Sequence, residues 1–251
     1  MGWFDSAKET TIPSWITDYV EIPPEVLEQF EEATSSLSST QYILIGTACV
    51  TSFAVGFRAG RVRPMFRRIT DVTDVPSSDL GHTSPWLTGR VASVSDGDTL
   101  RFWHVPSVLH SSKPDPDVKL SVQAIPVRIC TIDTPETAKF GKPGQPFGDD
   151  AKKYLSDLVL DKKVQIQLLT KDQYGRAVGQ VRRPGWFGKT YVDDYMLKAG
   201  LAEVYLGSGA VYGHRGKDAY IALQEKAHGS KKGVWSQKNR ETAAEYKART
   251  K

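Results

Sequence analysis

The chain has 251 residues, 39% of them hydrophobic and 25% charged, which allows one well-buried domain of roughly 150 residues with further segments at its ends and excludes disorder over the whole length. The net charge of +4 is the sum of −7 over residues 1–41, +2 over residues 58–85 and +9 over residues 86–251. The basic C-terminal part suits a polyanionic partner, although a merely soluble basic domain would also carry this charge. Cys49 lies in an apolar segment and Cys130 in an expected core strand, so a bridge between them is implausible and nothing in the sequence argues for a disulfide-stapled secreted domain.

An uncharged, apolar run follows the acidic N-terminal segment of residues 1–41. No charge occurs between Glu32 and Arg58. A helix over residues 42–59 would be about 27 Å long at ~1.5 Å per residue, close to the ~30 Å hydrocarbon core of a bilayer. The run lacks the polar face that a buried soluble helix, the alternative interpretation, should show. Residues 42–59 are therefore predicted to be a single transmembrane helix in contact with the lipid bilayer.

The charges on either side of this run predict its orientation. Glutamates precede it, and residues 60–85 form a basic juxtamembrane segment that continues into a linker rich in Asp, Ser and Pro. The arginines that follow the run are Arg58, Arg61, Arg63, Arg67 and Arg68. The positive-inside rule then places the C-terminal domain on the cytoplasmic or matrix side of a mitochondrial or other intracellular membrane.

The part after Trp86 is predicted to alternate short strands with helices. Residues 89–95 and 99–103 should form a hairpin, because Asp-Gly between alternating runs is a strong turn signal. Further strands are expected at residues 118–122, 125–132, 163–168 and 179–181, a surface loop at 106–117, and helices at 147–159, 191–200 and 217–228. This pattern indicates an α+β fold with a small barrel of the oligonucleotide-binding (OB-fold) type over residues 86–236, followed by a charged tail, residues 237–251.

Charged side chains at strand ends and in turns form a candidate catalytic set. They are Asp98, Arg128, Asp133, Glu136 and Arg176. Carboxylates suit a hard cation, and an arginine offers a planar, permanently charged fork to a phosphate. Each residue also has an ordinary structural explanation: Asp98 could cap a turn, Arg128 could pair with a structural carboxylate, and Glu136 could cap a helix. The five together favour a metal-assisted phosphodiester-cleaving site.

The ordered motifs resemble the thermonuclease family, typified by staphylococcal nuclease. The matching pieces are Asp96-Gly97-Asp98-Thr99, Val127-Arg128, Ile132-Asp133-Thr134-Pro135-Glu136, Asp172-Gln173-Tyr174-Gly175-Arg176, Gly200-Leu201-Ala202-Glu203-Val204-Tyr205 and Lys232-Gly233-Val234-Trp235-Ser236. A membrane span before such a domain is also similar to the single-pass, mitochondrion-associated thermonuclease-like proteins of eukaryotes. The late triplet Glu245-Tyr246-Lys247 agrees with that subgroup.

The resemblance implies a five-stranded barrel with three helices and a Ca²⁺ site. By residue match, Asp98 and Asp133 would hold Ca²⁺ with their carboxylates, and Thr134 would add its backbone carbonyl. Glu136 would orient or deprotonate the attacking water. No histidine shows the spacing of a zinc site.

The same match implies how substrate is held. Arg128 and Arg176 would bind the scissile phosphate and stabilise the charge of the transition state. Tyr174 and Tyr205 would contact a nucleotide, although aromatic packing explains both equally well.

These expectations combine into a membrane-anchored, Ca²⁺-dependent endonuclease that hydrolyses DNA, RNA or both. The alternative is a non-catalytic nucleic-acid- or protein-binding barrel tethered to a membrane. Such a module has no need to keep both arginines, both aspartates and the glutamate, and all five are present. The sequence indicates no protein partner.

Overall fold

The computed structural model describes residue 38 and residues 67–107, 110–139, 141–185 and 188–249. Contacts divide the chain into two units, Met1–Val62 and Arg63–Lys251, and all helices and strands given below belong to the second unit. The predicted transmembrane helix at residues 42–59 lies outside the described residues. Within the described ranges, no helix is both long and apolar enough to cross a membrane.

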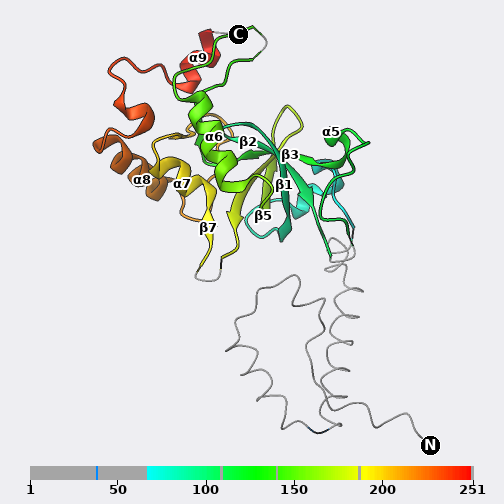
Figure 1. Cartoon of the computed structure of the whole chain (residues 1–251). Coiled ribbons are helices and arrows are strands. Elements are labelled where there is room, and N and C mark those ends of the chain that lie inside the picture. The colour runs from blue at the N-terminus through cyan, green and yellow to red at the C-terminus, as the bar shows by residue number, and fades with distance from the viewer. Residues whose placement is uncertain (1–37, 39–66, 108–109, 140, 186–187, 250–251) are drawn as a thin grey trace, which may run out of the picture. The chain divides into compact units, whose positions relative to one another are not determined.

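Five strands close into a barrel (Figure 1). They are β1 (Trp86–Asp96), β2 (Thr99–His104), β3 (Ile125–Ile129), β5 (Lys163–Lys171) and β6 (Ala177–Arg183). Strand β1 pairs antiparallel with β2 and β5, β2 pairs antiparallel with β3, and β5 pairs antiparallel with β6. A parallel pairing of β3 with β6 completes the ring, as the OB-type prediction requires.

Three shorter strands lie outside this ring. Strand β4 (Ile132–Asp133) pairs with β8 (Glu203–Val204), and β7 (Thr190–Tyr191) pairs with the end of β6. The predicted α+β class is confirmed. The five strands of the predicted barrel are present, but the described residues contain three more strands outside it, eight in all.

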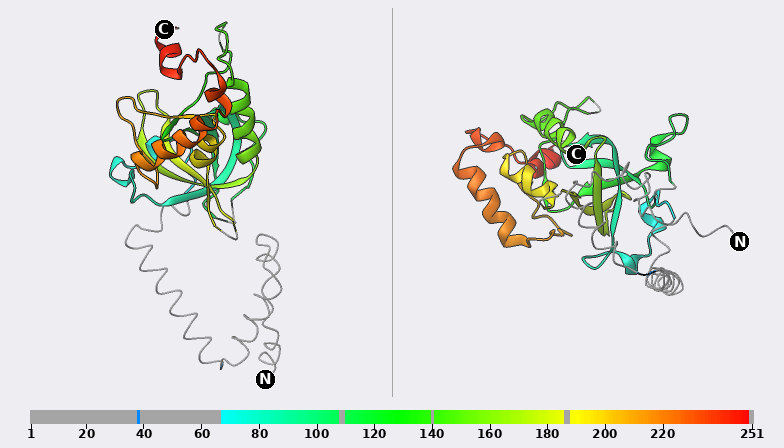
Figure 2. Two further views of the ribbon diagram at one scale, coloured as in Figure 1. Left: turned by 90° about the vertical axis from the view of Figure 1, so that its left-hand side faces the viewer. Right: turned by 60° about the horizontal axis from the view of Figure 1, so that its bottom comes forward.

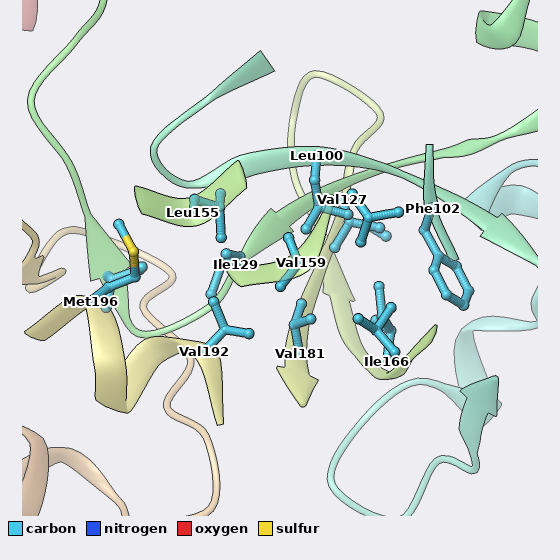
Figure 3. Packing of buried hydrophobic residues seen from close by; sticks show 14 of the residues in the cluster. Leu100, Phe102, Val127, Ile129, Leu155, Val159, Ile166, Val181, Val192 and Met196 are labelled. Atoms are coloured by element: carbon cyan, nitrogen blue, oxygen red, sulfur yellow. The ribbon is translucent and has the colours of Figure 1, made fainter. Parts of the chain in front are cut away.

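The core fills the barrel and the space beneath helix α6 (Gly148–Val159) (Figure 3). Alternate residues of β3 point inward, so Val127 and Ile129 are fully buried. Helix α6 contributes Ala151, Leu155 and Val159, which are spaced four residues apart and therefore share one face. Figure 3 shows Leu155 and Val159 lying among the side chains of the barrel strands.

The helices predicted at residues 147–159, 191–200 and 217–228 are confirmed as α6, α7 (Val192–Lys198) and α8 (Lys217–Gly229). Helices α7 and α8 pack side by side, as both figures show (Figures 1 and 2). The described chain also contains two short helices that were not expected, α5 (Leu120–Gln123) and α9 (Ala243–Arg249).

Two strand predictions were wrong. Residues 118–122 do not form a strand, because Gln123 donates to the Asp115 and Val118 carbonyls and folds the segment into the turn of α5. The single strand expected over 125–132 breaks at Thr131, whose φ of 73° is incompatible with an extended chain.

Residues that precede the predicted domain, and a loop within it, pack at one end of the barrel. Ile69 and Val72 belong to the buried core, and the Ile69 N–H donates to Nδ1 of buried His104 at 3.0 Å. The 106–117 loop is held at the same end of β2, where Trp103 Nε1 donates to the Ser111 carbonyl at 3.0 Å. This contact lies at the opposite end of β2 from the hairpin turn that carries the candidate site.

Candidate active site

Arg128 bridges the two predicted metal ligands. Its Nη1 lies 2.8 Å from Asp98 Oδ2, and its Nη2 lies 2.9 Å from Asp133 Oδ1. All three side chains are largely buried. Because one guanidinium contacts both carboxylates, Asp98 and Asp133 must lie side by side, although 35 residues separate them in sequence.

The barrel pairing explains this convergence. Arg128 on β3 lies opposite Thr99, the first residue of β2. The β1–β2 turn before Thr99 carries Asp98, whose carbonyl accepts from the Ile129 N–H at 2.8 Å. The break at Thr131 then turns the chain, so that Asp133 at the end of β4 approaches the same guanidinium.

Gly97 lets the hairpin turn approach the segment that contains Thr134. A Cβ atom at this position would lie 2.7 Å from Thr134 Oγ1 and 2.9 Å from Ala151 Cβ, closer than real Cβ contacts come. Thr134 itself is buried. The third predicted metal ligand therefore packs directly against the turn that carries Asp98.

Burial and neighbouring charge act against each other on the buried groups. Burial raises the pKa of Asp98, and Asp133 raises it further, whereas Arg128 and Lys247 oppose the shift. Burial by itself would lower the pKa of Arg128, but Asp98 and Asp133 outweigh it and raise that pKa. Two adjacent buried carboxylates need cations beside them to remain charged, and the site supplies such cations.

Glu136 lies at the edge of this group and is half-buried. Gln145 holds its backbone from both sides: the Gln145 side-chain oxygen accepts from the Glu136 N–H at 3.0 Å, and the Gln145 N–H donates to the Glu136 carbonyl at 2.8 Å. Burial raises the pKa of the Glu136 carboxyl; Lys247 opposes the shift, and the nearby Asp96 adds to it. A carboxylate that is rigidly held and more basic than usual can accept a proton from water.

Arg176 brings a second guanidinium to the hairpin. Its Nε donates to Asp172 Oδ2 at 2.7 Å, and its Nη1 donates to Thr99 Oγ1 at 3.3 Å. The Thr99 hydroxyl in turn donates to Asp98 at 2.8 Å, so Arg176 connects to the carboxylate pair through one side chain.

The two predicted nucleotide-contacting tyrosines occupy different positions. The ring of Tyr205 lies 5.2 Å from the Arg128 guanidinium carbon, next to the carboxylate pair. Tyr174 is 74% exposed, and its ring lies 5.6 Å from Arg176 at the outer edge. Both tyrosines border the site, and Tyr174 alone presents a largely open ring.

Two lysines of this site were missed from the sequence. Lys139 forms an ion pair with Asp96. Lys247 Nζ lies 2.7 Å from Asp133 Oδ1 and 3.1 Å from Glu136 Oε1. Burial would lower the pKa of Lys247, but Asp133 and other acidic neighbours outweigh it and raise that pKa. The Glu245-Tyr246-Lys247 triplet was the one available signal for Lys247.

The donor set at Asp98 and Asp133 fits a hard cation. Both residues supply carboxylate oxygens, the ligand type that Ca²⁺ prefers, and Thr134 packs beside them. A second acidic cluster in the described chain, formed by Asp193, Asp194 and His214, has ligand atoms within 4.8 Å of one another. Its carboxylates are already engaged, because Tyr220 donates to Asp193 and Arg215 pairs with Asp194.

Comparison with known proteins gives consistent results. The sequence profile described as "Staphylococcal nuclease homologue" matches residues 126–237. "Endonuclease Htp3" of Saprolegnia parasitica is 41% identical over 204 residues, which cover 80% of this chain and 95% of that protein. "Probable endonuclease LCL3" of Schizophyllum commune is 36% identical over 243 residues, 91% of this chain and 77% of that protein. The protein of the same name from Komagataella phaffii is 34% identical over 223 residues, which cover 83% of this chain and 97% of that protein.

The closed barrel with paired carboxylates and two arginines at one end therefore defines a hydrolytic nuclease. The chain belongs to the staphylococcal nuclease family, as the motifs predicted.

Proposed function

We propose that this chain is a Ca²⁺-dependent endonuclease that hydrolyses phosphodiester bonds of DNA, RNA or both. The observation that carries the proposal is the position of Arg128. It contacts both carboxylates of the predicted metal site, and Arg176 reaches the same hairpin through Thr99. The relatives named as endonucleases support the same activity.

Asp98 and Asp133 would hold the metal through their carboxylates, and Thr134 would add its backbone carbonyl. Bound Ca²⁺ would act as a Lewis acid on the phosphate and neutralise part of its charge. The buried position of both carboxylates strengthens their attraction for a cation, because the surroundings screen charge less than water does.

Arg128 and Arg176 bind the phosphate that is cleaved. Arg128 donates two of its five N–H groups to Asp133 and the Ile132 carbonyl and forms an ion pair with Asp98, so donors remain that can be offered to a phosphate. Arg176 directs one N–H to Asp172 and one to Thr99, which leaves three. Both guanidiniums stay charged, so they stabilise the negative charge that develops in the transition state.

Glu136 activates the nucleophile. Its carboxylate accepts a proton from the attacking water as the water oxygen bonds to phosphorus. The bond between phosphorus and the leaving sugar oxygen then breaks, and that oxygen takes a proton from solvent. The Gln145 contacts fix the backbone of Glu136, so the base is positioned before substrate arrives.

Cleavage of circular single-stranded DNA tests the proposal, because a circle has no ends for an exonuclease. The full chain in detergent should linearise the circle in millimolar Ca²⁺ and leave it intact in EGTA, and a circular RNA substrate tests RNA in the same way. A folded protein that binds Ca²⁺ and still leaves both circles intact would refute the catalytic proposal. Retained binding of the uncut circles would then support the alternative of a non-catalytic module.

The role of Arg176 can be tested by substitution. Arg176→Ala removes one electrostatic donor and should lower turnover by about 10²–10³-fold. Arg176→Lys keeps the charge but loses the planar fork, so it should restore only part of that loss. Arg183→Ala, at the far end of β6, the strand that begins directly after Arg176, is the matched control and should retain wild-type turnover. Equal turnover of Arg176→Ala and Arg183→Ala would remove Arg176 from the site.

Membrane anchoring and localisation belong to the same proposal. Residues 42–59 would span the bilayer once and place the nuclease on the cytoplasmic or matrix side of a mitochondrial or other intracellular membrane. The support is the uncharged run before Arg58 and the arginines that follow it. The full chain should stay in the membrane pellet after alkaline carbonate extraction, and a variant without residues 42–59 should be released. Release of the full chain would argue against a transmembrane anchor.

A further inference from the structure

The C-terminal segment, residues 237–249, returns to the active site and is docked there by buried side chains. Ala243 and Tyr246 of α9 are 2% and 5% exposed. The Tyr246 hydroxyl donates to the Pro143 carbonyl at 2.5 Å, and the Ala243 N–H donates to Glu203 Oε1 at 3.2 Å. Figures 1 and 2 show α9 beside the loop that leads into α6. The segment is therefore an ordered part of the nuclease domain.

This docking delivers one ammonium group to the catalytic carboxylates. Lys247 Nζ contacts Asp133 Oδ1 at 2.7 Å and Glu136 Oε1 at 3.1 Å. Lys247 and Asp133 are 114 residues apart along the chain. The next basic residue of α9, Arg249, instead pairs with Glu241 outside the site. Within α9, Lys247 is thus the cation directed at the candidate metal ligand and the candidate base.

Lys247 and a metal ion must compete for Asp133. The Oδ1 atom of Asp133 already accepts from two cations, Arg128 at 2.9 Å and Lys247 at 2.7 Å, and an oxygen has two lone pairs. A divalent cation at Oδ1 would therefore displace a donor, and one at Oδ2 of the same carboxylate would lie next to an ammonium of like charge. Arg128 is the more firmly held of the two, since it also pairs with Asp98. Lys247 is the partner that can leave, because its side chain is 36% exposed.

We propose that Lys247 is a further functional residue of the active site, which sets its affinity for Ca²⁺ by competing with the metal for Asp133. This inference rests on the proposed Ca²⁺ dependence. Metal binding displaces the Lys247 ammonium from Asp133 and Glu136, frees the Glu136 carboxylate for water, and loosens α9. By linkage, docking of α9 weakens metal binding by the same factor by which metal binding weakens docking.

Calorimetric titration of the full chain in detergent with Ca²⁺ tests the competition. Lys247→Met keeps the length of the side chain and removes its charge, so the Ca²⁺ dissociation constant should fall on the order of tenfold, within the usual range for coupled binding events. Lys153→Met is the matched control: it removes the same charge from an exposed pair with Asp157 on α6 and should leave the constant unchanged. Lys247→Arg keeps the charge and should bind Ca²⁺ nearly as the wild type does.

Hydrogen exchange of the wild-type protein gives a readout that needs neither a variant nor activity. Addition of Ca²⁺ should speed exchange of the amides of residues 243–249, while amides of α6 should remain unchanged or become slower. Unchanged or slower exchange in α9 would overturn the proposal and would mean that Lys247 stays in the loaded site.

The outcomes also separate this inference from the proposed function. A wild-type chain that binds Ca²⁺ while Lys247→Met binds it equally or more weakly would overturn the role of Lys247 alone. A wild-type chain that binds no Ca²⁺ would overturn both proposals.

Discussion

Replacement of Gly97 by alanine should disturb the candidate metal site without touching any charged group. The added Cβ would lie 2.7 Å from Thr134 Oγ1, 2.9 Å from Thr134 Cβ and 2.9 Å from Ala151 Cβ. Ala151 is fully buried on α6, and Thr134 is 2% exposed, so neither can move into solvent. The β1–β2 turn must therefore shift away from Thr134 and carry Asp98 with it.

The magnitude follows from two opposing effects. Forcing an extra carbon into a packed site costs about 1–3 kcal/mol. Alanine recovers about 0.4–1 kcal/mol by restricting the unfolded chain. The net loss of about 1–2 kcal/mol corresponds to a decrease in melting temperature of about 2–8 °C for a domain of this size. Because Asp98 moves, Ca²⁺ binding should weaken as well.

Thermal unfolding and Ca²⁺ titration of the full chain, compared with Gly229→Ala, measure both effects. Gly229 ends α8, and a Cβ there would meet nothing within 4 Å. That control should be neutral or stabilising by up to about 1 kcal/mol, since alanine favours helix more than glycine does. If Gly97→Ala melts and binds Ca²⁺ as Gly229→Ala does, the turn is not packed against Thr134 as described.

Two buried polar contacts away from the carboxylates should also respond to substitution. Burial, with help from the charges of Arg68 and His110, lowers the pKa of His104 to about 4. The folded state therefore binds fewer protons than the unfolded state between about pH 4 and 6.5. The free energy of unfolding should be at its full value above this window and fall by about 3 kcal/mol as the pH decreases through it. The free energy of unfolding in urea should differ less between pH 7 and pH 5 for His104→Gln than for the wild type. An equal difference in the two proteins would contradict a buried neutral His104. Thr131 Oγ1 accepts from the buried Gly213 N–H at 2.9 Å, so Thr131→Ala should cost about 1–3 kcal/mol while Thr131→Ser stays close to wild type; equal stability of the two variants would remove this hydrogen bond from the account.

Local sequence signals predicted most helices and strands because the forces that form them act over a few residues. The Asp96-Gly97 motif between alternating runs correctly predicted the hairpin. The turn itself is one residue later, at Gly97-Asp98, because Asp96 still pairs with Thr99. The four-residue spacing on α6 likewise gave a helix. One error arose where a side chain overrode strand propensity, because Gln123 bonds to nearby carbonyls. Another arose where a single residue with positive φ, Thr131, interrupts an extended segment.

The candidate site residues were available from the motif order, but their relations were not. Arg128 was expected either to bind a phosphate or to pair with a structural carboxylate. In the structure it pairs with Asp98 and Asp133, the two predicted metal ligands. One guanidinium can serve both purposes, because it has donors left after these pairs form.

The sequence by itself determined the family, the kind of barrel and the residue types of a phosphodiester-cleaving site. Tertiary structure alone decided which cations face which carboxylates. Lys247 reaches Asp133 across 114 residues because Tyr246 and Ala243 bury their side chains and dock α9 beside the site. Such a contact depends on long loops closing over a packed surface, so the Glu245-Tyr246-Lys247 triplet could mark Lys247 but not its partners.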